Sequence, residues 1–429
     1  MAGFGALLSR NRNYRYTWLG QVVSEIGDHF NNIAVFSLTL EQTRSGMAVS
    51  GVMLARALAM VTAGPIAGIL LDRLDRKRVM IASDLARAAI AYSFVLCLTS
   101  GAWSLYLLSA LLVFASPFFT SGRTAILPAI ASRDELHTAN SLTQTTQWTT
   151  LTIGTLLGGT SVMQFGYRWA FGFNALSFLF SALSIGGLRV AGGFRAERSD
   201  LTEERVLRPW HEYREGLRYM RQTPLVFGLA LVGVGWATGG GAAQILFSLF
   251  GEVVFHKGAA GIGAIWGSAG IGLLIGAAVA WRLGPRLSFS GYKWTVPVCY
   301  VIHGGAYVIF SQMERFWLLL VFIALSRASV GVSSVLNQTQ LLRHVADAYR
   351  GRVFSTMESM TWAMMMISMA VTGLASEVAS PRSIGAVAGV LSGSTAFFWA
   401  WANHRGKLPE PPEVGIEPEE VEVHGDPKV

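Results

Sequence analysis

Four polar side chains recur on one side of an apolar stretch near the beginning of the chain. Gln21, Glu25, Asp28 and Asn32 are spaced by four, three and four residues, which places them on one face of an α-helix. If that helix begins at about Tyr16, Asp28 lies roughly 18 Å along it, near the middle of a bilayer. The pattern predicts a hydrated face whose carboxyl groups, Asp28 and Glu25, bind and release protons. The alternative is a structural polar cluster that fixes this helix to its neighbours.

Two arginines fall at a comparable depth in other apolar stretches. A charge in mid-membrane costs at least about 2.5–3.5 kcal/mol on insertion scales, so each one is a candidate for function. We expect Arg56 to pair with Asp28 in one state and to separate from it in another, where Asp28 takes up a proton. Arg327 faces either an anionic or polar group of a substrate, or a neighbouring helix that it locks in place.

Other polar or aromatic residues within apolar stretches complete the candidate substrate cavity. They are His29, Phe36, Gln144, Trp148, Trp236, Gln244 and Trp362. The histidines are scattered, and the glycine-rich run GIGAIWGSAGIG lies inside an apolar stretch without a preceding strand, so a nucleotide-binding fingerprint is rejected. We therefore expect no enzyme, no cofactor and no metal site.

The composition requires a lipid environment. The chain has 429 residues, of which 52% are hydrophobic and 14% are charged, whereas a soluble domain carries about 25% charged residues. Cys97 and Cys299 both lie in apolar stretches, so a disulfide framework is not indicated. The N-terminus has no apolar segment followed by a small-residue cleavage site, and a cleavable signal peptide is not expected.

Twelve apolar stretches predict an all-α protein with twelve transmembrane helices. They are approximately 16–40, 47–71, 79–99, 103–128, 138–163, 168–188, 223–250, 259–282, 292–311, 315–339, 352–376 and 383–402. Lys and Arg concentrate in the N-terminus, the even-numbered connections and the tail, whereas the odd-numbered connections hold only Arg44, Arg168, Lys257, Arg315 and Arg382. Positive residues stay on the cytoplasmic side, so both termini are predicted to be cytoplasmic. The net charge of +8 thus reflects topology, and no nucleic-acid partner is expected.

The chain divides into two six-helix halves. The N-terminal half covers 1–188, a polar connection with an amphipathic helix covers 189–222, and the C-terminal half covers 223–402. The halves are alike at a shift of about 213 residues: RDELHTANSL at Arg133–Leu142 precedes one helix much as ADAYRGRVFS at Ala346–Ser355 precedes another. Such repeats place a substrate site near the midplane between the halves. The tail 403–429, rich in Pro and Glu, is predicted to be disordered.

The stretch GPIAGILLDRLDRKR, residues 64–78, resembles a signature of the major facilitator superfamily (MFS), Gly-x-x-x-Asp-Arg-x-Gly-Arg-Lys/Arg-Arg. Gly68, Asp72, Arg73, Arg76, Lys77 and Arg78 match it, and Asp75 stands where the family usually has glycine. The resemblance implies the MFS fold and a cytoplasmic latch that closes against a neighbouring helix end. The residues assigned to the latch are Gly64, Gly68, Asp72, Arg73, Arg76, Lys77, Arg78, Asp84 and Arg123.

Within the superfamily, the chain resembles the macrolide-efflux and siderophore-exporter branch of drug:proton antiporters. The stretches YTWLGQVVSEIGD, LPAIASRDELHTANSL and YRGRVF carry this resemblance. Gly154, Gly158 and Gly159 also resemble the antiporter pattern Gly-Pro-x-x-Gly-Gly, with Thr155 at the proline position. The resemblance implies a monomer in the bacterial inner membrane that exports amphipathic small molecules, such as drugs, in exchange for protons. A dedicated lysophospholipid or siderophore carrier, and a non-transporting sensor or scaffold, are the alternatives.

Overall fold

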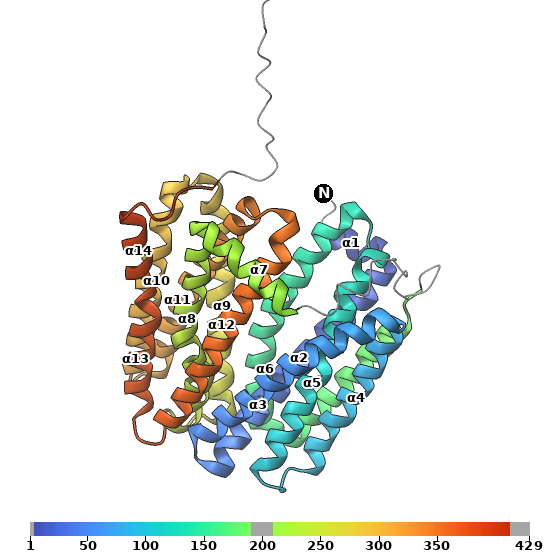
Figure 1. Ribbon diagram of the computed structural model, residues 1–429. Coiled ribbons are helices and arrows are strands. Elements are labelled where there is room, and N and C mark those ends of the chain that lie inside the picture. Colours follow the sequence, from blue (N-terminus) through green and yellow to red (C-terminus); the bar gives the residue numbers. More distant parts are fainter. Residues whose placement is uncertain (1–3, 190–208, 412–429) are drawn as a thin grey trace, which may run out of the picture.

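The computed structural model describes residues 4–189 and 209–411, and every regular element in these two ranges is a helix. Parts of the predicted connection and tail, residues 190–208 and 412–429, lie outside the described residues. The helices form two bundles that stand side by side, one built from the N-terminal half of the sequence and one from the C-terminal half (Figure 1). This arrangement confirms the predicted all-α polytopic fold.

The N-terminal bundle consists of one short helix and five long ones. They are α1 (Phe4–Arg10), α2 (Arg12–Thr43), α3 (Gly46–Arg73), α4 (Arg76–Leu96), α5 (Ala102–Ile130) and α6 (Arg133–Gly186). At 1.5 Å per residue, the 54 residues of α6 would extend about 80 Å, more than twice the thickness of a bilayer core. The helix breaks at Gly166, where φ is 80°, so it supplies two spans. Thr155 lies in a segment with helical dihedral angles, without the kink that a proline introduces.

The C-terminal bundle begins with α7 (Pro209–Gln222), which occupies the connection where an amphipathic helix is expected. The long elements are α8 (Pro224–Leu249), extended by the π-helical η2 (Phe250–Val254), α9 (Gly258–Leu283), α10 (Phe289–Gln312), α11 (Phe316–His344) and α12 (Asp347–Ala375). A short 3₁₀ turn, η3 (Gly284–Arg286), follows α9. The last span consists of α13 (Pro381–Gly393) and α14 (Thr395–His404).

Nine helical segments of the described chain are long and apolar enough to cross a membrane. The helices α2 and α12 are not among these nine, although they have 32 and 29 residues; α2 carries the predicted polar face. The nine also include Thr138–Gly186 as one segment, although it breaks at Gly166. The count of twelve spans and the cytoplasmic position of both termini stay predictions.

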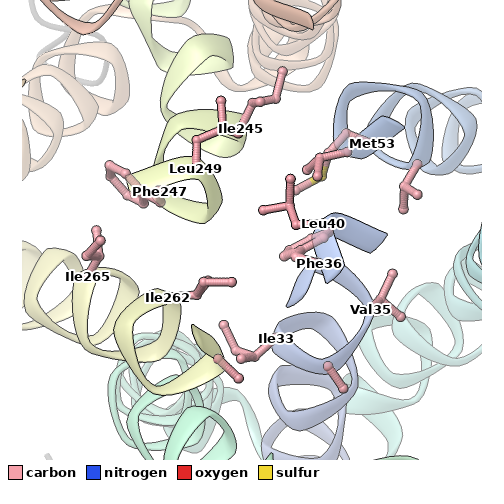
Figure 2. Close-up of a cluster of buried hydrophobic side chains, with 14 of the residues drawn as sticks. Ile33, Val35, Phe36, Leu40, Met53, Ile245, Phe247, Leu249, Ile262 and Ile265 are labelled. Atoms are coloured by element: carbon pink, nitrogen blue, oxygen red, sulfur yellow. The ribbon is translucent and has the colours of Figure 1, made fainter. Parts of the chain in front are cut away.

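The two bundles share a hydrophobic core at one end only. We call the end that carries α1, α7 and the end of α14 the terminal end, and the opposite end the distal end (Figure 1). The distal core is a buried cluster that draws on both halves and contains Phe36, Leu40, Met53, Leu249 and Ile262. Figure 2 shows these side chains converging from α2, α3, α8 and α9. Toward the terminal end each half has a separate core, one around Tyr14 and Met80 and the other around Tyr292 and Trp399.

Small residues bring α6 and α9 into backbone contact across the two halves. A Cβ on Gly263 would lie 2.3 Å from the carbonyl oxygen of Thr155, and one on Gly159 would lie 2.5 Å from that of Ala259. Such close approach between spanning helices is the usual role of glycines at this spacing. The glycine-rich run of α9 is therefore a packing surface.

Candidate functional site

The polar face of α2 points into the N-terminal bundle, where Glu25 is the most connected residue. Its carboxylate accepts hydrogen bonds from Gln21 Nε2 at 2.8 Å and from Thr150 Oγ1 of α6 at 2.7 Å. Arg123 Nη1 of α5 lies 3.7 Å from Glu25 Oε1 and forms an ion pair with it. Gln21 is buried. Through the contacts of Glu25 with Thr150 and Arg123, this end of the face links α2, α5 and α6.

Asp28 lies one turn further along α2 and is held differently. It is half-buried, and it forms no hydrogen bond or ion pair with any residue of the described ranges. Arg87 and Arg56 are nevertheless near enough to interact with it electrostatically. Arg56 stacks on the ring of Phe36, with its Cζ atom 5.6 Å from the ring centroid. The predicted Asp28–Arg56 ion pair is thus absent from this conformation, which corresponds to the separated state of the hypothesis.

A buried ion pair that the sequence analysis did not single out lies beside Asp28. Arg87 Nη2 of α4 donates a hydrogen bond to the carboxylate of Asp84, and both side chains are almost fully buried. The guanidinium lies between the rings of Phe119 and Phe178, with centroid distances of 4.7 and 4.3 Å. Arg87 interrupts an apolar stretch, which is the signal that would have identified it.

The carboxyl and guanidinium groups gathered at the polar face of α2 form a balanced set. Three carboxyl groups and three guanidinium groups lie within it: Glu25, Asp28, Asp84, Arg56, Arg87 and Arg123. Asp84 and Arg123, which the resemblance assigns to the latch, are both committed to ion pairs inside this bundle. They lie within α4 and α5, whereas the remaining latch residues lie in the second half of α3 and the first turn of α4.

The second half of α3, which carries Gly64, Gly68, Asp72 and Arg73, has no helix of the described chain packed against these residues in this conformation. A Cβ on Gly64 or on Gly68 would meet no atom within 4 Å, and Asp72 and Arg73 are exposed. Asp75 caps α4 by accepting a hydrogen bond from the Arg78 backbone N–H at 2.9 Å. This capping role suits Asp at the position where the family usually has glycine.

Two of the basic latch residues hold their own bundle together. Arg76 donates to the carbonyl oxygen of Ala125 at 2.9 Å, and Lys77 Nζ donates to those of Gly186 and Leu188 at 2.8 and 2.9 Å. They therefore satisfy carbonyl groups near the ends of α5 and α6. Arg78 is exposed.

The remaining cavity candidates are distributed over both bundles. Phe36 is 4% exposed and belongs to the distal core. The half-buried residues are His29, Asn32, Trp148, Trp236 and Gln244, whereas Gln144 and Trp362 are exposed. The structure thus joins Gln21 and Glu25 by a hydrogen bond, and distributes the other candidates over α2, α6, α8 and α12. No cluster of three His, Cys, Asp or Glu side chains able to hold a metal occurs in the described ranges.

The distal end is closed by serine–carboxylate bonds that the sequence analysis did not foresee. Ser37 Oγ of α2 donates to Glu252 Oε2 of η2 at 3.1 Å, and Ser45 Oγ donates to Glu377 Oε1 at 2.7 Å. Ser50 Oγ also donates to the carbonyl oxygen of Met369 at 2.8 Å. These three hydrogen bonds join the described parts of the two halves, and all of them lie at the distal end.

The glycine run of α8 packs closely against its neighbours. A Cβ on Gly239 would lie 2.3 Å from the carbonyl oxygen of Ala388, and one on Gly241 would lie 2.4 Å from that of Met365. Ser368 Oγ of α12 accepts a hydrogen bond from the N–H of Ala242 and donates one to the carbonyl of Thr238. A side chain placed in this way locally loosens the helix.

Sequence comparison relates most of this chain to membrane transporters. The sequence profile of the Major Facilitator Superfamily matches residues 17–290. An MFS-type transporter of Bacillus subtilis (strain 168), YfiS, is 27% identical over 384 residues, covering 86% of this chain and 88% of its own. The enterobactin exporter EntS of Escherichia coli O1:K1 / APEC is 27% identical over 357 residues and 81% of each chain. The putative bacilysin exporter BacE of Bacillus subtilis is 24% identical, covering 81% of this chain and 84% of its own.

Solved structures share the fold at low sequence identity. The nucleoside transporter NupG has a TM-score of 0.70 and 12% identity, covering 91% of this chain and 98% of its own. A bacterial homologue of the iron transporter ferroportin, in its inward-facing state, has a TM-score of 0.69 and 16% identity, covering 91% of this chain and 98% of its own.

Proposed function

Because the chain belongs to the Major Facilitator Superfamily and is a multi-pass transporter of the cell membrane, we propose that it exports amphipathic small molecules by alternating access, in exchange for protons. The observation that carries the proposal is the one-sided contact between the two bundles. They share a hydrophobic core and three hydrogen bonds at the distal end and have separate cores toward the terminal end.

This geometry supports a conformation open toward the cytoplasm. The excess of Lys and Arg in the terminal-end connections assigns that end to the cytoplasmic side by the positive-inside rule. Glycines that face no neighbour, Gly64 and Gly68, are available there for a closed state in which another helix approaches. Rocking of one bundle against the other around a central site is the motion that this class of fold uses.

The free carboxyl group of Asp28 is the proposed proton carrier. Glu25 already has three polar partners, whereas Asp28 has no hydrogen-bond partner among the described residues. A carboxylate in a low-dielectric site near two guanidinium groups changes its proton affinity when those groups move. Movement of Arg56 relative to Asp28 during alternation would therefore couple protonation to conformation.

Transport in proteoliposomes with an imposed pH gradient tests the proposal. We expect gradient-driven movement of ethidium by the wild-type protein and its loss in Asp28→Asn. Glu314→Gln is the matched control, because Glu314 is an exposed carboxyl group in the turn between α10 and α11. Ethidium movement that does not depend on the gradient, or that survives Asp28→Asn, would exclude Asp28 as the coupling group.

A dedicated siderophore carrier of the same fold is the second candidate. Its support is the similarity to the enterobactin exporter over 81% of each chain. A lysophospholipid carrier is distinguished in the same vesicles with a fluorescent lysophospholipid. Movement of a siderophore, or of the lysophospholipid, without movement of ethidium would make that compound the substrate in place of a drug-like one. A sensor or scaffold would move none of the three.

A further inference from the structure

A buried arginine in the C-terminal bundle has no counter-charge. Arg327 of α11 is 8% exposed, and the ion pairs of the described residues all involve Asp84, Glu25 or Glu215. The surrounding helices cannot supply a partner, because α8, α9, α10 and α11 contain no Asp or Glu. This differs from the polar face of α2 in the N-terminal bundle, where three carboxyl groups balance three guanidinium groups.

The side chains around Arg327 are aromatic and offer further hydrogen-bond donors. Its guanidinium Cζ lies 5.4 Å from the ring centroid of Phe247. The indole of Trp266 packs edge-on against the same ring, at a centroid distance of 5.0 Å. Neither Trp266 Nε1 nor the hydroxyl of Tyr307 has a hydrogen-bond partner, although both atoms are buried. Buried polar atoms are normally paired, so Trp266, which shares the ring of Phe247 with Arg327, and Tyr307, which lies within electrostatic range of Arg327, each keep a donor for a further partner.

The nearby histidine is already occupied. His303 Nδ1 is 2.7 Å from Ser326 Oγ, and its ring contacts that of Tyr307 at a centroid distance of 6.1 Å. His303 therefore packs against Tyr307 and is itself held by Ser326. The guanidinium of Arg327 is the permanent positive charge of the site.

We propose that Arg327, with Trp266 and Tyr307, forms an anion-binding subsite that receives the carboxylate or phosphate-type oxyanion of an amphipathic substrate. The proposal rests on the transport function proposed above, and it adds amphiphiles that carry an oxyanion to the substrates that ethidium, a cation, represents there. A guanidinium group binds oxyanions through paired N–H donors, and the rings of Phe247 and Trp266 provide an apolar wall for the attached body of the ligand. An incoming anion also supplies the counter-charge that α8, α9, α10 and α11 lack.

Equilibrium binding to the full chain in phosphatidylcholine nanodiscs tests the subsite without requiring transport. The probes are 1-pyrenebutyrate and its neutral analogue 1-pyrenebutanol, followed by fluorescence anisotropy. We expect the wild-type protein to bind the carboxylate about tenfold more tightly than the alcohol, because one charge-assisted contact is of this order. Arg327→Gln should abolish the preference, and Arg327→Lys should retain part of it.

A matched control and two milder variants keep the test decisive. Arg343→Gln changes an exposed arginine at the end of the same helix and should keep the preference. If Arg327→Gln no longer binds the neutral probe, its fold has failed, and Trp266→Phe and Tyr307→Phe, which each remove one donor, replace it; each should reduce the preference. Equal affinity for both probes in the wild-type protein, or an unchanged preference in these variants, overturns the proposal.

The lipid composition of the nanodisc distinguishes a substrate anion from a lipid headgroup. Replacing about a fifth of the phosphatidylcholine with phosphatidylglycerol should leave pyrenebutyrate binding unchanged if the site serves a substrate. Competition by phosphatidylglycerol would assign the site to a lipid headgroup and overturn the substrate assignment. Loss of ethidium transport with an intact preference for the carboxylate would contradict only the proposed drug export.

Discussion

Ser376, which follows the last residue of α12, faces Gly46 of α3 so closely that a Cβ on the glycine would lie 2.9 Å from the serine Cβ. The two residues belong to different halves, and neighbouring side chains, Ser45 and Glu377, are joined by a hydrogen bond of 2.7 Å. The contact combines neutral serine donors with carboxylates and contains no ion pair between described residues. It is therefore a closure that can be broken at modest cost.

A disulfide between these positions should lock the distal end. In a chain with Cys97 and Cys299 replaced by alanine, we expect Gly46→Cys with Ser376→Cys to form a cross-link on oxidation, because disulfide Cβ atoms are about 3.8 Å apart and a small shift suffices. Transport should stop on oxidation and return on reduction. Gly51→Cys with Ser376→Cys is the control, since Gly51 faces Tyr106 within its own half. Full transport by the cross-linked protein would contradict opening at this end.

Substitution of a latch glycine should leave the stability of the present conformation unchanged and should prevent the conformation that is closed at the terminal end. Gly68→Leu adds a side chain where the structure has no neighbour within 4 Å, so the melting temperature should hardly change. Close approach of another helix would be blocked, and transport should fall roughly tenfold or more through loss of the terminal-closed state. Gly172→Leu, which also meets no atom within 4 Å, should transport normally. An active Gly68→Leu protein would remove Gly68 from the latch.

Gly263, unlike Gly68, should be required for the stability of the present conformation, which is closed at the distal end. Its α-carbon faces the backbone of α6, where a Cβ would lie 2.3 Å from the carbonyl oxygen of Thr155. Gly263→Val should therefore push α6 and α9 apart and destabilise the distal-closed conformation, with a lower melting temperature in detergent. The accessibility of Cys introduced at Ser37 to a water-soluble maleimide should rise. Unchanged stability and accessibility would show that this contact does not hold the two halves.

The sequence predicted the helices well because membrane-spanning segments are marked by long apolar runs. It predicted the polar face of α2 because polar side chains are costly to insert into a membrane, so those that occur within an apolar run stand out. It did not predict how the polar residues pair. Arg123 is assigned to the latch by resemblance, and that role stays a prediction; its ion pair with Glu25 was not predicted, since depth along a helix does not specify which neighbour it meets. Thr150 and Ser37 are ordinary hydroxyl residues whose partners lie far away in sequence, and only the packed bundles bring them to Glu25 and Glu252.

The buried pair of Asp84 and Arg87 should be structural. Arg87→Leu leaves Asp84, which is 0% exposed, without its partner, and breaking a buried pair in this way costs about 3–5 kcal/mol. We expect a clear fall in the melting temperature and partial recovery in the double variant Asp84→Asn with Arg87→Leu. Arg286→Leu, at an exposed site beyond α9, should melt like the wild type. Equal melting of Arg87→Leu and wild type would mean that the pair contributes nothing to stability.

Glu25 and Asp28 should differ in proton coupling although they lie three residues apart on α2. The oxygens of Glu25 are held by Gln21, Thr150 and Arg123, so its carboxyl group is fixed in place in the present conformation. Asp28 has no such partner among the described residues and can change its protonation when the nearby guanidinium groups move.

We expect Asp28→Asn to abolish proton flux coupled to substrate, measured with a pH dye trapped in proteoliposomes. Glu25→Gln keeps the shape of the side chain and should reduce coupled flux less than Asp28→Asn does. The reverse order of effects would make Glu25 the carrier and Asp28 a structural residue.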